Sequence, residues 1–183
     1  MGKSYEVIDE KVERWMSRQK IFFVATAPLG ADALVNCSPK GRDTLRILAP
    51  KVLAYMDGDG SGIETVAHIK ENGRIVLMMC AFDGPPKIYR FHGHGEVIEP
   101  HHDAFDELRA KFPEGNCRTI IKIAVTKISD SCGYGVPNYE YKGERASFGN
   151  LMQQVTSADL EKLRKENNEF SLDGLPGLEG GTE

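Results

Sequence analysis

The chain has 183 residues, a length typical of a single domain with a sizeable core. It is 40% apolar and 27% charged, and 23 basic residues against 27 acidic ones give a net charge of −4. No basic run stands out, which disfavours nucleic-acid binding because such binding depends on neutralising phosphates. The longest apolar runs, IFFVATA and IVLMMCAF, are too short to cross a membrane, and residues 1–15 lack the apolar core of a secretory signal. We therefore expect one cytoplasmic domain over residues 1–183.

The apolar pattern predicts a mainly β protein with peripheral helices. Short apolar runs follow one another in pairs, and only one helix intervenes between strands in the first half of the chain. This favours a barrel of about six antiparallel strands over a parallel, doubly wound sheet. In chain order the predicted elements are a helix at 9–18, strands at 21–27, 33–38, 45–48 and 51–57, a helix at 61–72, strands at 74–82 and 87–99, a helix at 100–112, a strand at 118–128 and a helix at 157–168.

The predicted strand at 87–99 has two different faces, because successive side chains alternate along a strand. Gly93 and Gly95 lie on its apolar face, where a missing side chain permits tight coiling. The apolar face also has Tyr89, Phe91 and Val97, and the polar face has Arg90, His92, His94 and Glu96.

Two segments near the end of the chain have a different composition. Residues 129–150 are rich in glycine and aromatic residues, so we expect an irregular but packed segment. Residues 151–183 add the C-terminal helix and then a tail, SLDGLPGLEGGTE, that we expect to be extended.

The four cysteines and the histidines indicate no metal site. The cysteines are widely spaced without a Cys-x-x-Cys, so we expect reduced thiols. His92 and His94 could chelate a metal from one strand face. A structural zinc site needs about four ligands, however, and no further cysteine or histidine is placed beside them.

The stretch GDGSGIETVAHIKEN, residues 58–72, permits two interpretations. Ser61 and Glu64 have the spacing of a capping box, which accounts for a helix start without any ligand. Free amides at a helix N-terminus also attract phosphate, and glycines let a ligand approach the backbone. Since Glu64 would repel an anion, this second interpretation needs a cation, and Lys40 in the preceding loop SPKG is the candidate.

The order of three motifs decides between them. NCSPKG, then VLAYMD, then GSGIETVAHIKENGRIVLMM resembles the pyridoxamine phosphate oxidase-like family of FMN-binding split barrels. The resemblance extends from about residue 10 to residue 145, and NNEFSLDGLPGL resembles the ending of one branch of that family. It implies a split β-barrel, an FMN cofactor and a homodimer with FMN at the interface.

The resemblance also assigns roles to individual residues. It implies that the second strand brings polar groups to the flavin phosphate, that the following strand lays its backbone along the isoalloxazine edge, and that the helix start grips the phosphate. A glycine- and tyrosine-containing loop would form the wall of the neighbouring subunit's site. In that order the residues are Asn36, Ser38 and Lys40; Tyr55, Met56 and Asp57; Ser61, Gly62, Thr65 and His68; and Gly133 and Tyr134.

Departures from the family pattern bear on the substrate. The oxidase proper has arginine in place of Asn36 and Ser-Arg-Lys in place of Ser61 to Ile63, and its carboxy-terminal substrate motif is absent here. Pyridoxamine phosphate is therefore not the expected substrate. We expect a flavin-dependent oxidoreductase that acts on another small molecule, without assigned catalytic residues. The alternative is a non-catalytic flavin-binding or haem-binding protein, in which one histidine would be an axial ligand.

Overall fold

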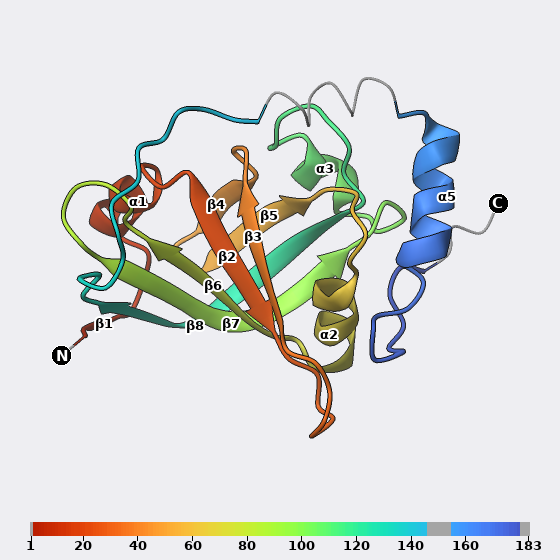
Figure 1. The fold of residues 1–183 in the computed structure, drawn as a ribbon, viewed down its shortest axis with the longest axis horizontal. Helices are drawn as coiled ribbons and strands as arrows, with labels where there is room; N and C mark the ends of the chain where they lie inside the picture. The colour runs from red at the N-terminus through yellow and green to blue at the C-terminus, as the bar shows by residue number, and fades with distance from the viewer. Residues whose placement is uncertain (1, 146–154, 180–183) are drawn as a thin grey trace.

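The computed structural model describes residues 2–145 and 155–179, and its centre is a curled antiparallel sheet (Figure 1). The sheet has eight strands in the order β3-β2-β6-β7-β8-β5-β4, with β1 paired to β8. Because the order ends at β3 and β4, the sheet is a half-barrel with two open edges. This confirms the expected split barrel, although with more strands than predicted. The strands are β1 Ser4–Tyr5, β2 Ile21–Thr26, β3 Asn36–Gly41, β4 Leu45–Ala49, β5 Val52–Asp57, β6 Arg74–Cys80, β7 Ile88–Ile98 and β8 Thr119–Ser131.

Four helices are described around this sheet: α1 Glu10–Met16, α2 Glu64–Asn72, α3 Phe105–Arg109 and α5 Ser157–Asn167. α1 begins at Asp9, whose carboxylate accepts a hydrogen bond of 2.8 Å from the Val12 amide. α2 packs against β2, β6 and β7, and α5 lies at the edge of the molecule with no buried residue (Figure 1). None of the described helices is long and apolar enough to cross a membrane.

The sheet separates two apolar clusters, because alternate residues of each strand face opposite sides. Leu53 and Tyr55 of β5 belong to the main core inside the half-barrel, together with Phe91 of β7. Ala54 and Met56 face the other side, where they pack against Leu108 of α3. All six side chains are buried. β5 therefore presents Tyr55 and Asp57 to one side and Met56 to the other.

Three predicted helices are shorter than expected. The helix predicted at 9–18 extends only over Glu10–Met16. The helix predicted at 61–72 begins at Glu64, after Ile63 as its N-cap. The helix predicted at 100–112 is α-helical only from Phe105 to Arg109. The residues before it form turns, closed by a 2.9 Å bond from the His102 amide to the Glu99 carbonyl.

The two faces of β7 are as predicted. Tyr89 and Phe91 are buried, whereas His92 and His94 are exposed. The register with β8 shifts between His92 and Gly93. A Cβ atom at Gly93 would collide with the Ala124 carbonyl oxygen. The glycine therefore permits a close approach of two backbones at this irregularity.

We predicted an extended tail, but in the structure the tail folds back on itself. We call the last turn of α5 and the segment after it, residues 164–179, the C-terminal arm. Phe170 and Pro176 form an antiparallel bridge, and the Leu178 amide donates to the Asn168 carbonyl at 2.9 Å. Leu178 packs against the main core, which explains the difference, because burying an apolar side chain favours the folded arm.

Candidate functional site

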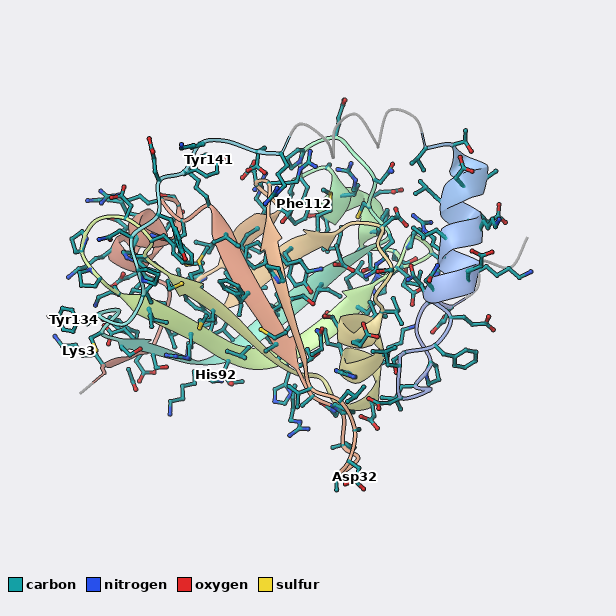
Figure 2. All side chains as sticks on the ribbon, viewed as in Figure 1. Lys3, Asp32, His92, Phe112, Tyr134 and Tyr141 are labelled. Atoms are coloured by element: carbon teal, nitrogen blue, oxygen red, sulfur yellow. The ribbon has the colours of Figure 1, made fainter. Side chains whose placement is uncertain are left out.

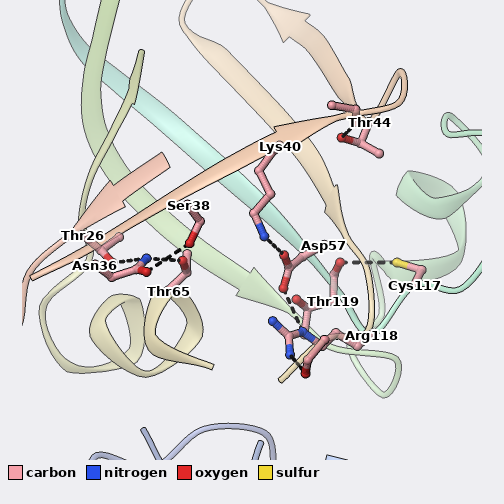
Figure 3. Close-up of polar contacts among 12 residues, drawn as sticks. Thr26, Asn36, Ser38, Lys40, Thr44, Asp57, Thr65, Cys117, Arg118 and Thr119 are labelled. Atoms are coloured by element: carbon pink, nitrogen blue, oxygen red, sulfur yellow. Dashed lines mark hydrogen bonds and ion pairs between the residues drawn. The ribbon is translucent and has the colours of Figure 1, made fainter. Parts of the chain in front are cut away.

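The first part of the site is the inward face of β3. Asn36, Ser38 and Lys40 alternate with the exposed Cys37 and Pro39, so they share one side of the strand. In the ladder they pair with Thr26, Val24 and Phe22 of β2, which are all buried. The three polar residues therefore point toward the inside of the half-barrel at its open edge (Figure 3).

A hydrogen-bonded polar network connects this face to α2. The Asn36 side-chain amide donates to Thr65 Oγ1 at 2.9 Å, and its oxygen accepts from Ser38 Oγ at 3.0 Å. Thr26 Oγ1 lies 3.0 Å from His68 Nδ1 and 3.4 Å from Asn36 Nδ2. The structure thus brings together four residues that the sequence assigned to one site from two separate segments. Figure 3 shows three of them, Asn36, Ser38 and Thr65.

The second part of the site is a buried ion network. Lys40 Nζ lies 2.6 Å from Asp57 Oδ1, and Arg118 Nε lies 2.9 Å from Asp57 Oδ2. Asp57 is fully buried and Arg118 is 5% exposed, whereas the Lys40 side chain keeps 23% exposure. Two cations around one carboxylate leave one net positive charge beside the polar network.

Arg118 was missed by the sequence analysis. It precedes the apolar run TIIKIAV, where an arginine directly before a buried strand is a weak hint of a buried partner. It also donates to the Gly60 carbonyl at 3.2 Å and to Asn168 Oδ1 at 2.9 Å. Arg118 therefore joins β5, the loop before α2 and the C-terminal arm.

Three buried polar atoms next to these groups have no hydrogen-bond partner among the described residues: Tyr55 Oη, His68 Nε2 and Thr119 Oγ1. Burial raises the pKa of Tyr55, whose ring packs edge-on against Phe22 and lies below the Lys40 ammonium. Burial lowers the pKa of His68, which favours a neutral ring. Buried polar atoms are nearly always satisfied by protein, water or ligand, so these atoms leave capacity for a bound group.

The predicted capping box at the start of α2 is not formed. No side chain caps α2, and Ser61 and Gly62 are exposed. Ile63 is the N-cap and is 1% exposed. Burial of this apolar residue fixes where the helix begins, so Ser61 lies before the position from which it could cap. The first amides of α2 consequently receive no side-chain acceptor.

Gly133 and Tyr134 lie apart from the polar network within one chain. Tyr134 is 84% exposed and lies at the β1 end of the molecule (Figure 2). The irregular segment was predicted from residue 129, but residues 129–131 continue β8. Residues 132–145 are irregular, as predicted, but mostly exposed rather than packed. One contact is made by Tyr139, whose ring centroid lies 5.4 Å from that of Phe82. The remainder of the predicted segment, 146–150, lies outside the described residues.

Two cavities are found elsewhere on the surface. One of about 360 Å³ lies between α1 and the β3–β4 turn, and one of about 270 Å³ lies between α2, β7 and Glu179. Neither is lined by Asn36, Ser38 or Lys40. Across residues 2–145 and 155–179, no three histidine, cysteine, aspartate or glutamate side chains are grouped to hold a metal ion. Asn36, Ser38 and Lys40 are partly exposed, whereas Thr65 and His68 behind them are buried.

Comparison with known proteins identifies the family. No family model matches the chain. The pyridoxamine 5'-phosphate oxidase family protein ustO of Aspergillus flavus is 33% identical over 192 aligned positions, which cover 95% of this chain and 77% of that protein. The chain therefore belongs to the pyridoxamine 5'-phosphate oxidase family, and the resemblance noted in its sequence is confirmed.

Solved structures show the same fold. HupZ of Group A Streptococcus superposes with a TM-score of 0.54 at 20% identity, over 73% of this chain and 99% of that one. A Lactobacillus delbrueckii protein assigned as a pyridoxamine 5'-phosphate oxidase superposes with a TM-score of 0.54 at 18% identity, over 69% and 98%. At these identities the likeness concerns the split-barrel fold alone.

Proposed function

We propose that the protein binds FMN on the face formed by β3, β5 and the start of α2, and that it is a flavin-dependent oxidoreductase acting on a small molecule. The observation on which this depends is the polar network: Asn36 and Ser38 from β3 meet Thr65 and His68 from α2, with Lys40 beside them. Membership of the pyridoxamine 5'-phosphate oxidase family supports the same cofactor class.

The chemistry of these groups fits a phosphate. Lys40 and Arg118 outweigh the single charge of Asp57, and Lys40 remains partly exposed. The amides in the first turn of α2 have no side-chain cap, and such amides attract anions. Neutral donors on Asn36 and Ser38 would complete the site. Glu64 in the first turn opposes an anion, so the cations are needed to balance it.

Bound FMN would supply the hydride or electron transfer, and the chain would supply binding and orientation. Lys40 and the α2 start would hold the phosphate. The backbone of Tyr55, Met56 and Asp57 would border the flavin ring. His68 would stay neutral and offer Nε2 as a single hydrogen-bonding atom, because burial lowers its pKa.

The proposal includes a second copy of the chain. The β3 side of the polar network is partly exposed, so a second copy of the chain could cover a ring bound there. Gly133 and Tyr134 of the second copy would form the other wall, in a homodimer with two shared sites. The exposed thiols of Cys37 and Cys132 are unpaired, which supports a reducing compartment such as the cytoplasm.

An absorbance spectrum of the purified protein tests the proposal. Flavin bands, with turnover of a reduced nicotinamide, are the expected result. Flavin bands without turnover would show that the protein binds flavin but is not the proposed oxidoreductase. A Soret band would replace flavin with haem, and a featureless visible spectrum that persists after incubation with FMN would overturn cofactor binding altogether.

A further inference from the structure

The conformation of the loop before α2 is fixed by hydrogen bonds from residues that are distant in the sequence. The Gly60 carbonyl accepts hydrogen bonds from Asn168 Nδ2 at 2.9 Å and from Arg118 Nη1 at 3.2 Å. The Asp59 carboxylate is bound by Arg164 through contacts of 2.6 and 3.0 Å. Since no capping box holds this loop, its conformation depends on these tertiary contacts.

The C-terminal arm is a firm support for these contacts. Asn168 is fully buried, and its carbonyl accepts from the Leu178 amide at 2.9 Å. A Cβ atom at Gly177 would lie only 2.7 Å from Ile63 Cγ1, so the arm backbone packs directly on the N-cap residue of α2. Lys70 of α2 donates to the Gly177 carbonyl at 2.7 Å, which fastens the arm a second time.

The same contacts extend to the cation on β3. Asn168 Oδ1 accepts from Arg118 Nη1 at 2.9 Å, and Arg118 Nε binds one oxygen of Asp57. The other oxygen of Asp57 binds Lys40. Arg118 and Asp57 are both buried, so they have few alternative positions. A change at Asn168 therefore acts on the loop backbone directly and on Lys40 through two buried groups.

We propose that the C-terminal arm positions the phosphate-binding side of the site, with Asn168 and Arg118 as positioning residues that set the affinity for the cofactor phosphate. The inference rests on the proposed function, since the loop and Lys40 are the groups assigned to that phosphate. Asn168 binds the Gly60 carbonyl of the loop and the Arg118 guanidinium, and so fixes both. Without it, both the loop amides and the Lys40 ammonium lose their fixed places.

The test compares Asn168→Ala with Asn167→Ala. Asn167 is the neighbouring residue, and within the described part of the chain its side chain donates to the Leu163 carbonyl of its own helix. FMN is titrated against flavin-free protein, with flavin fluorescence as the readout. Hydrogen exchange of residues 60–62 is measured without FMN. We expect Asn168→Ala to weaken FMN binding about tenfold, the effect of one charge-assisted hydrogen bond, and to speed exchange of the loop. Asn167→Ala should change neither.

Arg164→Gln provides a second variant in case Asn168→Ala does not fold, because Arg164 is partly exposed and its loss removes only the Asp59 contact. It should weaken FMN binding in the same direction, and because the Asp59 carboxylate is only 1% exposed, losing its partner should also lower the melting temperature, so FMN is titrated below the onset of unfolding. Wild-type FMN affinity in both folded variants would overturn the positioning role. If the wild-type protein itself does not bind FMN, the proposed function fails and this inference with it. That result is distinguished from the former by the wild-type titration alone.

Discussion

Lys40 and Asp57 form an ion pair across two strands, with 2.6 Å between Lys40 Nζ and Asp57 Oδ1. The sequence indicated Lys40 as a cation available to a phosphate, and the structure shows it already bound to a fully buried carboxylate. Arg118 binds the second oxygen of the same carboxylate, so Lys40, Asp57 and Arg118 together carry one net positive charge. Lys40 thus has two functions, one in stability and one in the proposed binding of phosphate.

Lys40→Ala should separate these two functions. Removing the ammonium leaves Asp57 with one cationic partner, and we expect a loss on the order of 1–3 kcal/mol in the free energy of unfolding. FMN binding should weaken about tenfold or more. Urea unfolding without FMN and a fluorescence titration measure the two effects. Lys40→Met is the control for stability, since it removes the charge but keeps most of the apolar stem and should recover the part of the loss that is due to packing. Unchanged FMN affinity in Lys40→Ala would contradict the assigned site.

Ser61→Ala distinguishes ligand binding from helix capping. Ser61 is exposed and does not cap α2, so its loss should change the stability of the flavin-free protein by no more than about 0.5 kcal/mol. With excess FMN the variant should melt at a lower temperature than the wild type, because a weaker ligand adds less to stability. Melting curves with and without FMN give both values. Equal curves for the two proteins under both conditions would remove Ser61 from the phosphate site.

The inward face of β3 could be predicted because strand alternation is a local rule. Asn36, Ser38 and Lys40 lie at every second position of β3, Asn36–Gly41. The strand predicted at 33–38 covered only Asn36 and Ser38 and left Lys40 in a loop, so the prediction was correct for the first two residues and wrong for the third, because the pairing of Lys40 with Phe22 extends the strand. Arg118 could not be predicted in the same way, since its partner Asp57 is 61 residues away and nothing in either local sequence identifies the pair. Its discovery required the β5–β8 ladder, in which Asp57 pairs with Thr119.

The predictions of a capping box and of an extended tail were wrong for a related reason. The spacing of Ser61 and Glu64 is a correct local signal, but burial of Ile63 decided where the helix begins. The composition of the tail favours an extended chain, but Leu178 reaches the core and the backbone turns to permit it. In both places a tertiary contact of one apolar side chain outweighed a local preference.

His68 should make stability depend on pH. Burial lowers its pKa more than the charges of Glu64, Asp173 and Glu71 raise it. The unfolded chain therefore binds a proton at about pH 6.5, before the folded protein does. Stability is complete above that pH and falls as the pH decreases toward the lowered pKa, by at most about 1.4 kcal/mol per unit.

Urea unfolding of wild type and His68→Gln between about pH 5 and pH 8 checks this dependence. The glutamine variant cannot take up the proton, so its stability should change less with pH than that of the wild type over the acidic part of the range. His94→Gln is the control on the exposed face of β7. Parallel pH profiles for wild type and His68→Gln would show that His68 does not contribute.

The two glycines of β7 should differ in their tolerance of alanine. A Cβ atom at Gly93 would meet the Ala124 carbonyl oxygen of β8, a backbone atom that cannot move without disturbing the ladder. A Cβ atom at Gly95 would lie 2.8 Å from Ile69 Cδ1, the end of a side chain that can change rotamer. We expect Gly93→Ala to cost about 3 kcal/mol or more and Gly95→Ala about 1 kcal/mol. Thermal unfolding of both variants measures the order, and a larger loss at Gly95 would contradict it.

Tyr134→Asp tests the proposed homodimer together with the shared site. Tyrosine buries a large area while keeping a hydroxyl for a partner, and 84% of Tyr134 is exposed on one chain. A dimer of about 40 kDa, twice the 20.3 kDa of one chain, is expected, with an interface burying more than about 2,000 Å². A charge placed there should weaken association and, because the second copy would form one wall of the site, also weaken flavin retention.

Light scattering measures the mass, and the flavin absorbance of the same fractions measures retention. Leu172→Asp is the matched control. Leu172 is 78% exposed on the C-terminal arm, so this variant also places a charge on a highly exposed apolar side chain. It should leave the dimer intact. A wild-type monomer that holds one FMN per chain would disprove both the interface and the shared site. If Tyr134→Asp remains a dimer but loses flavin, Tyr134 contributes to the flavin site but not to the dimer interface.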